Sequence, residues 1–260
     1  MTFKINPHAF SPAENLLWKY GVSSPEEIDL EAIAFDCGLS IRRRLLEGSD
    51  ARLVAFDNRG VITVNTRQNP KRQRFSIGHE ISHWLYDRPT CEDAMVACSK
   101  DEVSPRNQAA RGKESEANRF SADLLLPPYL VLPRIQARET NIILAIELAD
   151  EFDASLPAAA IRVVRHSNRA AAVVVHNQHG LLWKFKNALW PVYDELAPKV
   201  HHDSPAMDLL FTGGVRTKTQ DRKEPAIRWV YGDGMFERQV QVQSIKRYGE
   251  QILSIVRLVS

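Results

Sequence analysis

The segment 74–87, RFSIGHEISHWLYD, constrains the fold of this chain most, because it sets two histidines four residues apart around a glutamate. Its apolar residues recur at helical spacing, Pro70 precedes it, and Pro89 follows it, which predicts a helix. On a helix, positions i and i+4 lie on one face, about 5–6 Å apart at Cβ. His79 and His83 can therefore offer imidazole nitrogens to a single metal ion.

Glu80, between the two histidines, is placed to take part in catalysis at the metal ion. Catalytic zinc sites commonly take three protein ligands and leave a fourth position for water. A glutamate adjacent to the first histidine projects beside the ion, where it can accept a proton from that water. The pattern therefore predicts a Zn²⁺-dependent metallopeptidase with Glu80 as the general base.

The third ligand has to come from another segment, and ESEANRFSADLLLP, which again has helical spacing, is the best place for it. Glu114 and Asn118 are four residues apart, so a carboxylate ligand would lie next to an amide able to hydrogen-bond a ligating histidine. Glu116 points about 200° away from Glu114 around the same helix, so both cannot bind the ion. Glu102 and Asp101 are weaker candidates.

The pattern of apolar residues along the chain predicts an α+β fold. Helices are expected first, then a small antiparallel sheet, the histidine helix, a further helix and a helix pair with a helix–turn–helix look. The corresponding segments are 11–21, 28–38, 39–46, 51–57, 60–66, 70–87, 114–126 and 141–166. From about residue 170 the pattern becomes β-branched and aromatic. We expect a metallopeptidase domain over residues 1–168 and a β-rich domain over residues 169–260.

The stretches QRFSIGHEISHWL and ESEANRFSADLLLPP resemble the ImmA/IrrE family of bacterial metallopeptidases, over residues 25–165. The resemblance implies a gluzincin-like site with His79, His83 and Glu114 as ligands and Glu80 as the general base. It also implies that Asn118 orients His79. Ser121 stands where the family pattern has alanine, and both residues are small.

The resemblance also carries expectations about function. It implies an endopeptidase that cleaves a partner helix–turn–helix transcriptional repressor and so derepresses stress, anti-phage or mobile-element genes. Single-stranded DNA is a candidate activator, and a GAF-like sensor fold is a candidate for the C-terminal region. The alternatives are a DNA-binding regulator with a structural or vestigial metal site, and a small-molecule metallohydrolase.

Two chemical roles stay open at this stage. The group that stabilises the tetrahedral oxyanion could be Tyr86, His176 or Tyr129. A thiolate in the open zinc position would displace the water, and Cys98, with Cys91 as the second choice, lies between the two ligand segments. We therefore expect Cys98 to be an inhibitory metal ligand.

The amino-acid composition limits the binding partners and the cellular location that we expect. A formal charge of +2 is too close to neutral to argue for nucleic-acid or membrane binding, although two groups of arginines stand out. They are Arg42, Arg43 and Arg44, and Arg162, Arg165 and Arg169. Three cysteines, no basic-then-apolar leader and no long apolar run predict reduced thiols, a cytoplasmic location and no membrane contact. His201 and His202 are expected to be surface residues.

Overall fold

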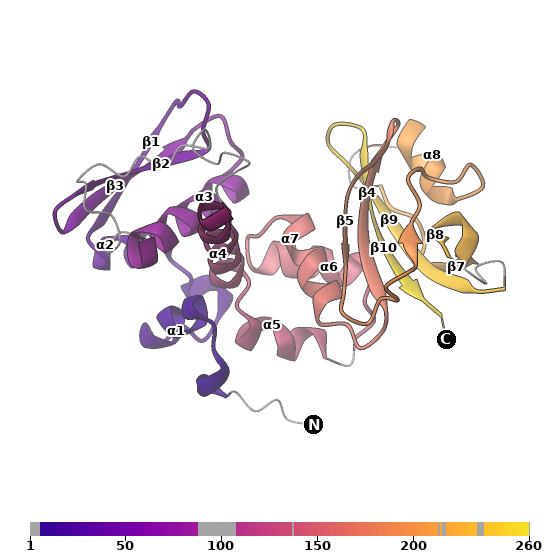
Figure 1. Ribbon diagram of the computed structural model, residues 1–260, viewed down its shortest axis with the longest axis horizontal. Coiled ribbons are helices and arrows are strands. Elements are labelled where there is room, and N and C mark those ends of the chain that lie inside the picture. Colours follow the sequence, from indigo (N-terminus) through magenta and orange to yellow (C-terminus); the bar gives the residue numbers. More distant parts are fainter. Residues whose placement is uncertain are drawn as a thin grey trace. The chain divides into compact units, whose positions relative to one another are not determined.

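The computed structural model (Figure 1) describes residues 6–87, 108–136, 138–212, 214, 217–232 and 237–259. Contacts within the chain divide it into two compact units. The first consists of Met1–Pro133 with Glu151–Ser155, and the second of Arg134–Asp150 with Leu156–Ser260. This division differs from the predicted boundary at residue 168, because both helices of the predicted pair group with the C-terminal strands, while the turn that joins them groups with the first unit.

The first unit is mixed α and β. Its elements are η1 (Pro7–Ala9), α1 (Pro12–Lys19), η2 (Pro25–Glu27), α2 (Leu30–Asp36), β1 (Leu39–Arg44), β2 (Ala51–Phe56), β3 (Arg59–Asn65), α3 (Pro70–Ser82), the π-helical η3 (His83–Asp87), α4 (Gln108–Leu125) and α5 (Pro128–Ile135).

The first helix begins and ends where its sequence signals predict. The Ser11 hydroxyl accepts a hydrogen bond from the backbone N–H of Glu14 (3.3 Å), and the Glu14 carboxylate accepts one from the N–H of Ser11 (2.9 Å). This reciprocal capping box satisfies two donors that the helix cannot satisfy internally. After α1 and α2, Gly21 and Gly38 adopt φ values of 72° and 80°, the left-handed conformation that ends a helix most easily when no Cβ is present.

The small sheet is mixed, and the expectation of an antiparallel sheet was wrong for one of its strands. Its order is β1-β3-β2, with β2 antiparallel and β1 parallel to β3. The two-residue turn Asp57–Asn58 closes the β2–β3 hairpin, which occupies one edge of β3. Only the other edge is left for β1, which pairs there in the parallel direction. Ile62 and Val64 of the central strand are fully buried.

The second unit is built on a five-stranded antiparallel sheet of order β5-β4-β10-β9-β7. Its elements are α6 (Ile142–Glu151), α7 (Leu156–Arg165), β4 (Ala171–Asn177), β5 (Gly180–Lys186), β6 (Glu195–Leu196), α8 (Pro205–Phe211), β7 (Arg222–Pro225), η6 (Ala226–Arg228), β8 (Val230–Tyr231), β9 (Gln239–Arg247) and β10 (Gln251–Leu258).

Helices cover both faces of this sheet (Figure 1). Gln243 of β9 accepts a hydrogen bond from the N–H of Ile142 in α6 (3.0 Å), and Lys246 donates to the carbonyl of Leu210 in α8 (3.2 Å). Residues 243 and 246 point to opposite faces of a strand, so α6 and α8 lie on opposite sides. The core on the α8 side includes Trp190 and Trp229.

In the part of the chain that the structure describes, no helix combines the length and apolar character that crossing a lipid bilayer requires.

Candidate metal centre

Helix α3 carries the two histidines, and its start is fixed by local signals. The side chain of Asn69 accepts a hydrogen bond from the N–H of Arg72 (2.9 Å), and Pro70 occupies the first helical position. Ile77 and Ile81 are buried in the core of the first unit. This burial fixes the rotation of the helix about its axis and so the direction in which His79 and His83 point.

Helix α4 packs unusually close to α3 at one point. A Cβ atom built on Gly78 would lie 2.7 Å from Oγ of Ser121 and 3.3 Å from its Cβ, so a larger residue does not fit without a shift. The Ser121 hydroxyl donates to the carbonyl of Phe75 in α3 (2.7 Å). This interhelical bond uses the hydroxyl that the family pattern lacks, and it fixes the two ligand-bearing helices against each other.

The structure brings His79, His83 and Glu114 together, with one ligand atom from each within 4.8 Å of the others. The Nε2 atoms of the two histidines are 3.0 Å apart, and each is 3.3 Å from an oxygen of Glu114. Tetrahedral zinc bonds of about 2.0–2.1 Å place neighbouring ligand atoms about 3.3 Å apart. Two imidazoles and a carboxylate at these separations therefore fit a zinc ion.

Each histidine is oriented from behind through its other ring nitrogen. Nδ1 of His79 lies 3.2 Å from Oδ1 of Asn118, and Nδ1 of His83 makes a short contact with a carboxylate oxygen of Asp87. With Nδ1 protonated, each ring donates to its oxygen partner and presents the Nε2 lone pair to the metal position. The other oxygen of Asp87 lies 3.4 Å from the ammonium group of Lys113.

Glu80 is 4% exposed, and its Oε2 atom has no hydrogen-bond partner among the described residues. Burial raises the pKa of this carboxyl to about 7, although the neighbouring histidines act in the opposite direction. For His83, burial alone would lower the pKa, but hydrogen bonds to Glu114 and Asp87 raise it to about 9. Hydrogen bonds from both histidines hold the pKa of Glu114 well below its usual range.

In the part of the chain that the structure describes, two of the three groups in the cluster are partly exposed. The side chains of His79 and Glu114 keep exposed fractions of 17% and 36%, whereas His83 is at 4%. A small molecule can therefore approach the point on which the three groups converge. Structural zinc sites, by contrast, are usually closed by four protein ligands.

The structure separates the remaining candidates. Glu116 is exposed and does not belong to the three-residue cluster, as its helical position predicts. The hydroxyl of Tyr129 donates to the carbonyl of Val22 (2.7 Å) inside the first unit, and Nε2 of His176 donates to the carbonyl of Ala197 (2.9 Å) in the second. Neither is therefore available to an oxyanion, while Tyr86 is half exposed and remains a candidate.

Other predicted positions have different outcomes. Cys98, Cys91, Asp101 and Glu102 lie outside the described residues. His201 is partly and His202 largely exposed, as expected, and they form a second group with Asp203 whose ligand atoms lie within 4.8 Å of one another.

Asp87 is the site residue that sequence reasoning missed. It stands four residues after His83, so the helical spacing that relates His79 to His83 also relates His83 to Asp87. A carboxylate at that position is a suitable partner for the outer nitrogen of a ligating histidine. The signal was therefore present in the sequence as a continuation of the motif.

Comparison with known proteins identifies a domain that contains this cluster. The IrrE N-terminal-like domain of peptidase family M78 matches residues 36–164, which contain both histidines, Glu80 and Glu114. A Mycobacterium tuberculosis transcriptional regulator of known structure is similar in fold, with a TM-score of 0.58 and 15% identity over 94% of this chain and 73% of that one. A search of curated proteins finds no significant match. Because residues 36–164 match this peptidase-type domain, the chain belongs to the ImmA/IrrE family.

Proposed function

We propose that this protein is a zinc-dependent endopeptidase in which His79, His83 and Glu114 hold the ion. The observation that carries the proposal is the convergence of these three groups beside a buried glutamate. When bound, the ion would supply Lewis-acid activation of a water molecule and of the peptide carbonyl.

The chain's own residues would do the rest. Oε2 of Glu80, which has no partner among the described residues, would accept a proton from the attacking water and pass it to the leaving amine. Asn118 and Asp87 would keep the two imidazoles in the correct tautomer and orientation. The close packing of α3 against α4 would hold Glu114 at a fixed distance from the histidines.

As substrate, we propose a helix–turn–helix transcriptional repressor whose cleavage derepresses stress, anti-phage or mobile-element genes. Membership of the ImmA/IrrE family supports this partner. Single-stranded DNA bound to the basic clusters is proposed as an activator. The thiolate of Cys98, with Cys91 as the second choice, is proposed as a ligand that blocks the site.

The second unit is proposed to be a GAF-like sensor. Its central feature is the five-stranded antiparallel sheet of order β5-β4-β10-β9-β7. Helices on both faces are consistent with such a module. A sensor joined to a peptidase would make cleavage conditional on a signal.

The alternative is a DNA-binding regulator with a structural or vestigial metal. The similarity in fold to a protein described as a transcriptional regulator favours it. The exposed side of the metal cluster favours the peptidase, because a purely structural ion needs no approach from solvent.

Glu80→Gln separates the two. The variant keeps the size of the side chain and every proposed ligand, so elemental analysis should find zinc at the wild-type stoichiometry. Cleavage of the repressor encoded next to the gene should fall by about 10²–10⁴-fold, the usual contribution of a general base.

Two further variants complete the experiment. Glu114→Ala should lose both zinc and cleavage, whereas Glu116→Ala, on the same helix but outside the cluster, should lose neither. Repressor cleavage by Glu80→Gln at the wild-type rate would contradict the proposed peptidase mechanism and favour the DNA-binding regulator.

A further inference from the structure

The three-stranded sheet of the first unit has one face that no described element covers. Register partners point to the same side of a sheet, so the rows Arg42–Thr63–Arg52 and Ser40–Val61–Val54 share this face with Phe56 and Arg59. Their neighbours along each strand, such as Leu53 and Ile62, are buried on the opposite face. We call this face, formed by Ser40, Arg42, Arg44, Arg52, Val54, Phe56, Arg59, Val61 and Thr63, the arginine face.

Charge on the arginine face is of one sign. All ionisable side chains in β1, β2 and β3 are arginines. Arg43 points to the other side and pairs with Glu31. Arg42, Arg44, Arg52 and Arg59 are exposed, and their guanidinium groups have no carboxylate partner among the described residues. Guanidinium groups remain charged at every physiological pH, so the face is permanently cationic.

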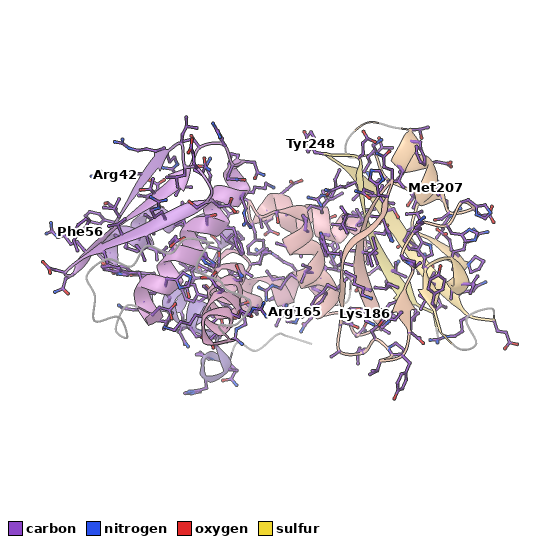
Figure 2. All side chains as sticks on the ribbon, turned by 45° about the horizontal axis from the view of Figure 1, so that its top comes forward. Arg42, Phe56, Arg165, Lys186, Met207 and Tyr248 are labelled. Atoms are coloured by element: carbon purple, nitrogen blue, oxygen red, sulfur yellow. The ribbon has the colours of Figure 1, made fainter. Side chains whose placement is uncertain are left out.

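The centre of the arginine face is apolar. Val54 and Val61 are register partners in its middle, both half-buried, and Phe56 at its end is 60% exposed. Figure 2 labels Arg42 and Phe56 on this sheet. β-branched residues on a pleated surface pack well against a second layer. Among the described elements, that layer is present only on the other face, where α3 contacts β2 and β3.

We propose that the arginine face docks an acidic amphipathic helix of a partner protein. The apolar stripe of such a helix would cover Val54 and Val61, and carboxylates on both flanks would pair with the four guanidinium groups, a match that favours bidentate contacts. The inference does not depend on the metal chemistry, since the face lies on the opposite side of the sheet from α3.

Other occupants fit less well. A second copy of the chain joined through the same face would place arginine against arginine. Single-stranded nucleic acid favours sheets with aromatic residues under the bases, whereas valines occupy the centre here and the single aromatic ring lies at the end. Anionic lipid headgroups would use the charge but leave the apolar centre without a specific role.

Binding to synthetic peptides of about 14 residues, enough for about four helical turns, tests the proposal. The probe is a panel of glutamate-rich amphipathic helices with a leucine stripe, each paired with a scrambled peptide of the same composition. Fluorescence anisotropy gives the affinity for the full-length protein. Amide chemical shifts locate binding, and we expect changes at Arg52, Val61 and Thr63.

Two sets of variants distinguish docking on this face from general charge attraction. The double variant Arg42→Ser/Arg52→Ser should weaken peptide binding about tenfold, because two exposed ion pairs of modest strength are lost. Arg43→Ser, on the same strand but pointing to the other side, should have no effect. Val61→Thr keeps the shape but adds a hydroxyl, so it should also weaken peptide binding, while leaving attraction that depends on charge alone unchanged.

Several results would overturn the proposal. These are no binding by any member of the panel, equal binding of the scrambled peptides, or shift changes located away from the sheet. Tighter binding of a single-stranded oligonucleotide or of phosphatidylserine vesicles, lost in the same double variant and indifferent to Val61→Thr, would assign the face to that partner instead.

Discussion

At the scale of single residues, we expect zinc affinity to depend also on the groups that hydrogen-bond the ligating histidines. Asp87 contacts Nδ1 of His83, the less exposed of the two histidines. Replacing Asp87 by alanine removes the acceptor that selects the tautomer. Loss of such partners typically weakens metal binding about 10–100-fold. We expect a loss in this range for Asp87→Ala, measured as the zinc dissociation constant by competition with a chromophoric chelator.

Glu116→Ala is the matched control for Asp87→Ala, because it removes an exposed carboxylate of the first unit that is not part of the cluster. Circular dichroism should be unchanged in both variants. Zinc affinity equal to that of the wild type in Asp87→Ala would show that the contact with His83 does not tune the site.

His176 supplies a prediction about pH in the second unit. Burial lowers the pKa of this imidazole, and its Nδ1 atom has no partner among the described residues. The unfolded chain, with a histidine pKa of about 6.5, therefore binds the proton more readily than the folded one. Stability of the second unit is complete above that pH and falls as the pH decreases below it.

The measurement is the free energy of unfolding at about pH 7.5 and about pH 5, followed by tryptophan fluorescence. In His176→Gln, the free energy of unfolding should differ less between the two pH values than it does in the wild type. His179→Gln, at an exposed position in the adjacent turn, should keep the wild-type difference. The same pH dependence in His176→Gln and wild type would exclude His176 as its source.

Sequence reasoning at this scale worked where a residue's role follows from helical spacing. It placed His79, His83, Glu114 and Asn118 on facing sides of two helices, and the structure brings them together. It could not place Tyr129 or His176, because the partners of these side chains come from segments distant in sequence.

At the scale of elements, the contact between α3 and α4 depends on a matched pair of small residues. Gly78→Ala would put a methyl group 2.7 Å from the Ser121 hydroxyl, which is held by its bond to Phe75. Overpacking of this kind costs about 1–3 kcal/mol. We expect Gly78→Ala to lower the free energy of unfolding by that amount and also to weaken zinc binding, since the ligands lie on both helices.

Ser121→Ala tests whether the two positions are coupled. Combined with Gly78→Ala, it removes the oxygen that the new methyl group meets, so the double variant should recover most of the lost stability. A double-mutant cycle by urea denaturation measures the interaction. Purely additive effects would mean that the clash is relieved elsewhere, for example by a rotation of Ser121.

The elements themselves were predictable to different degrees. Helices α1 and α2 follow from caps and glycine stops, which act within a few residues. The direction of β1 was not predictable in the same way, because parallel and antiparallel pairings bury the same side chains of β3. The change from α to π geometry at His83 also has no separate sequence signal that we can name.

At the scale of the whole molecule, net charge conceals local charge. The chain is near neutral, yet the four exposed arginines of the arginine face have no acidic residue in the strands that carry them. Overall composition therefore does not reveal this face, since a formal charge of +2 is a sum over the whole chain. The register of the three strands was needed to see it.

The division into two compact units leads to a prediction about zinc and stability. His79, His83 and Glu114 all belong to the first unit, and none of these three ligands comes from the second. A ligand that binds only the folded state adds about 4 kcal/mol at 1,000 times its dissociation constant. Zinc should therefore raise the melting temperature of the first unit and leave that of the second unchanged.

Scanning calorimetry with zinc and with a chelator should show two transitions, of which only one changes its temperature. The moving transition should become insensitive to zinc in Glu114→Ala and remain sensitive in Glu116→Ala. A single transition that shifts as a whole would mean that the two units unfold together, and a zinc-dependent shift retained in Glu114→Ala would place the ion elsewhere.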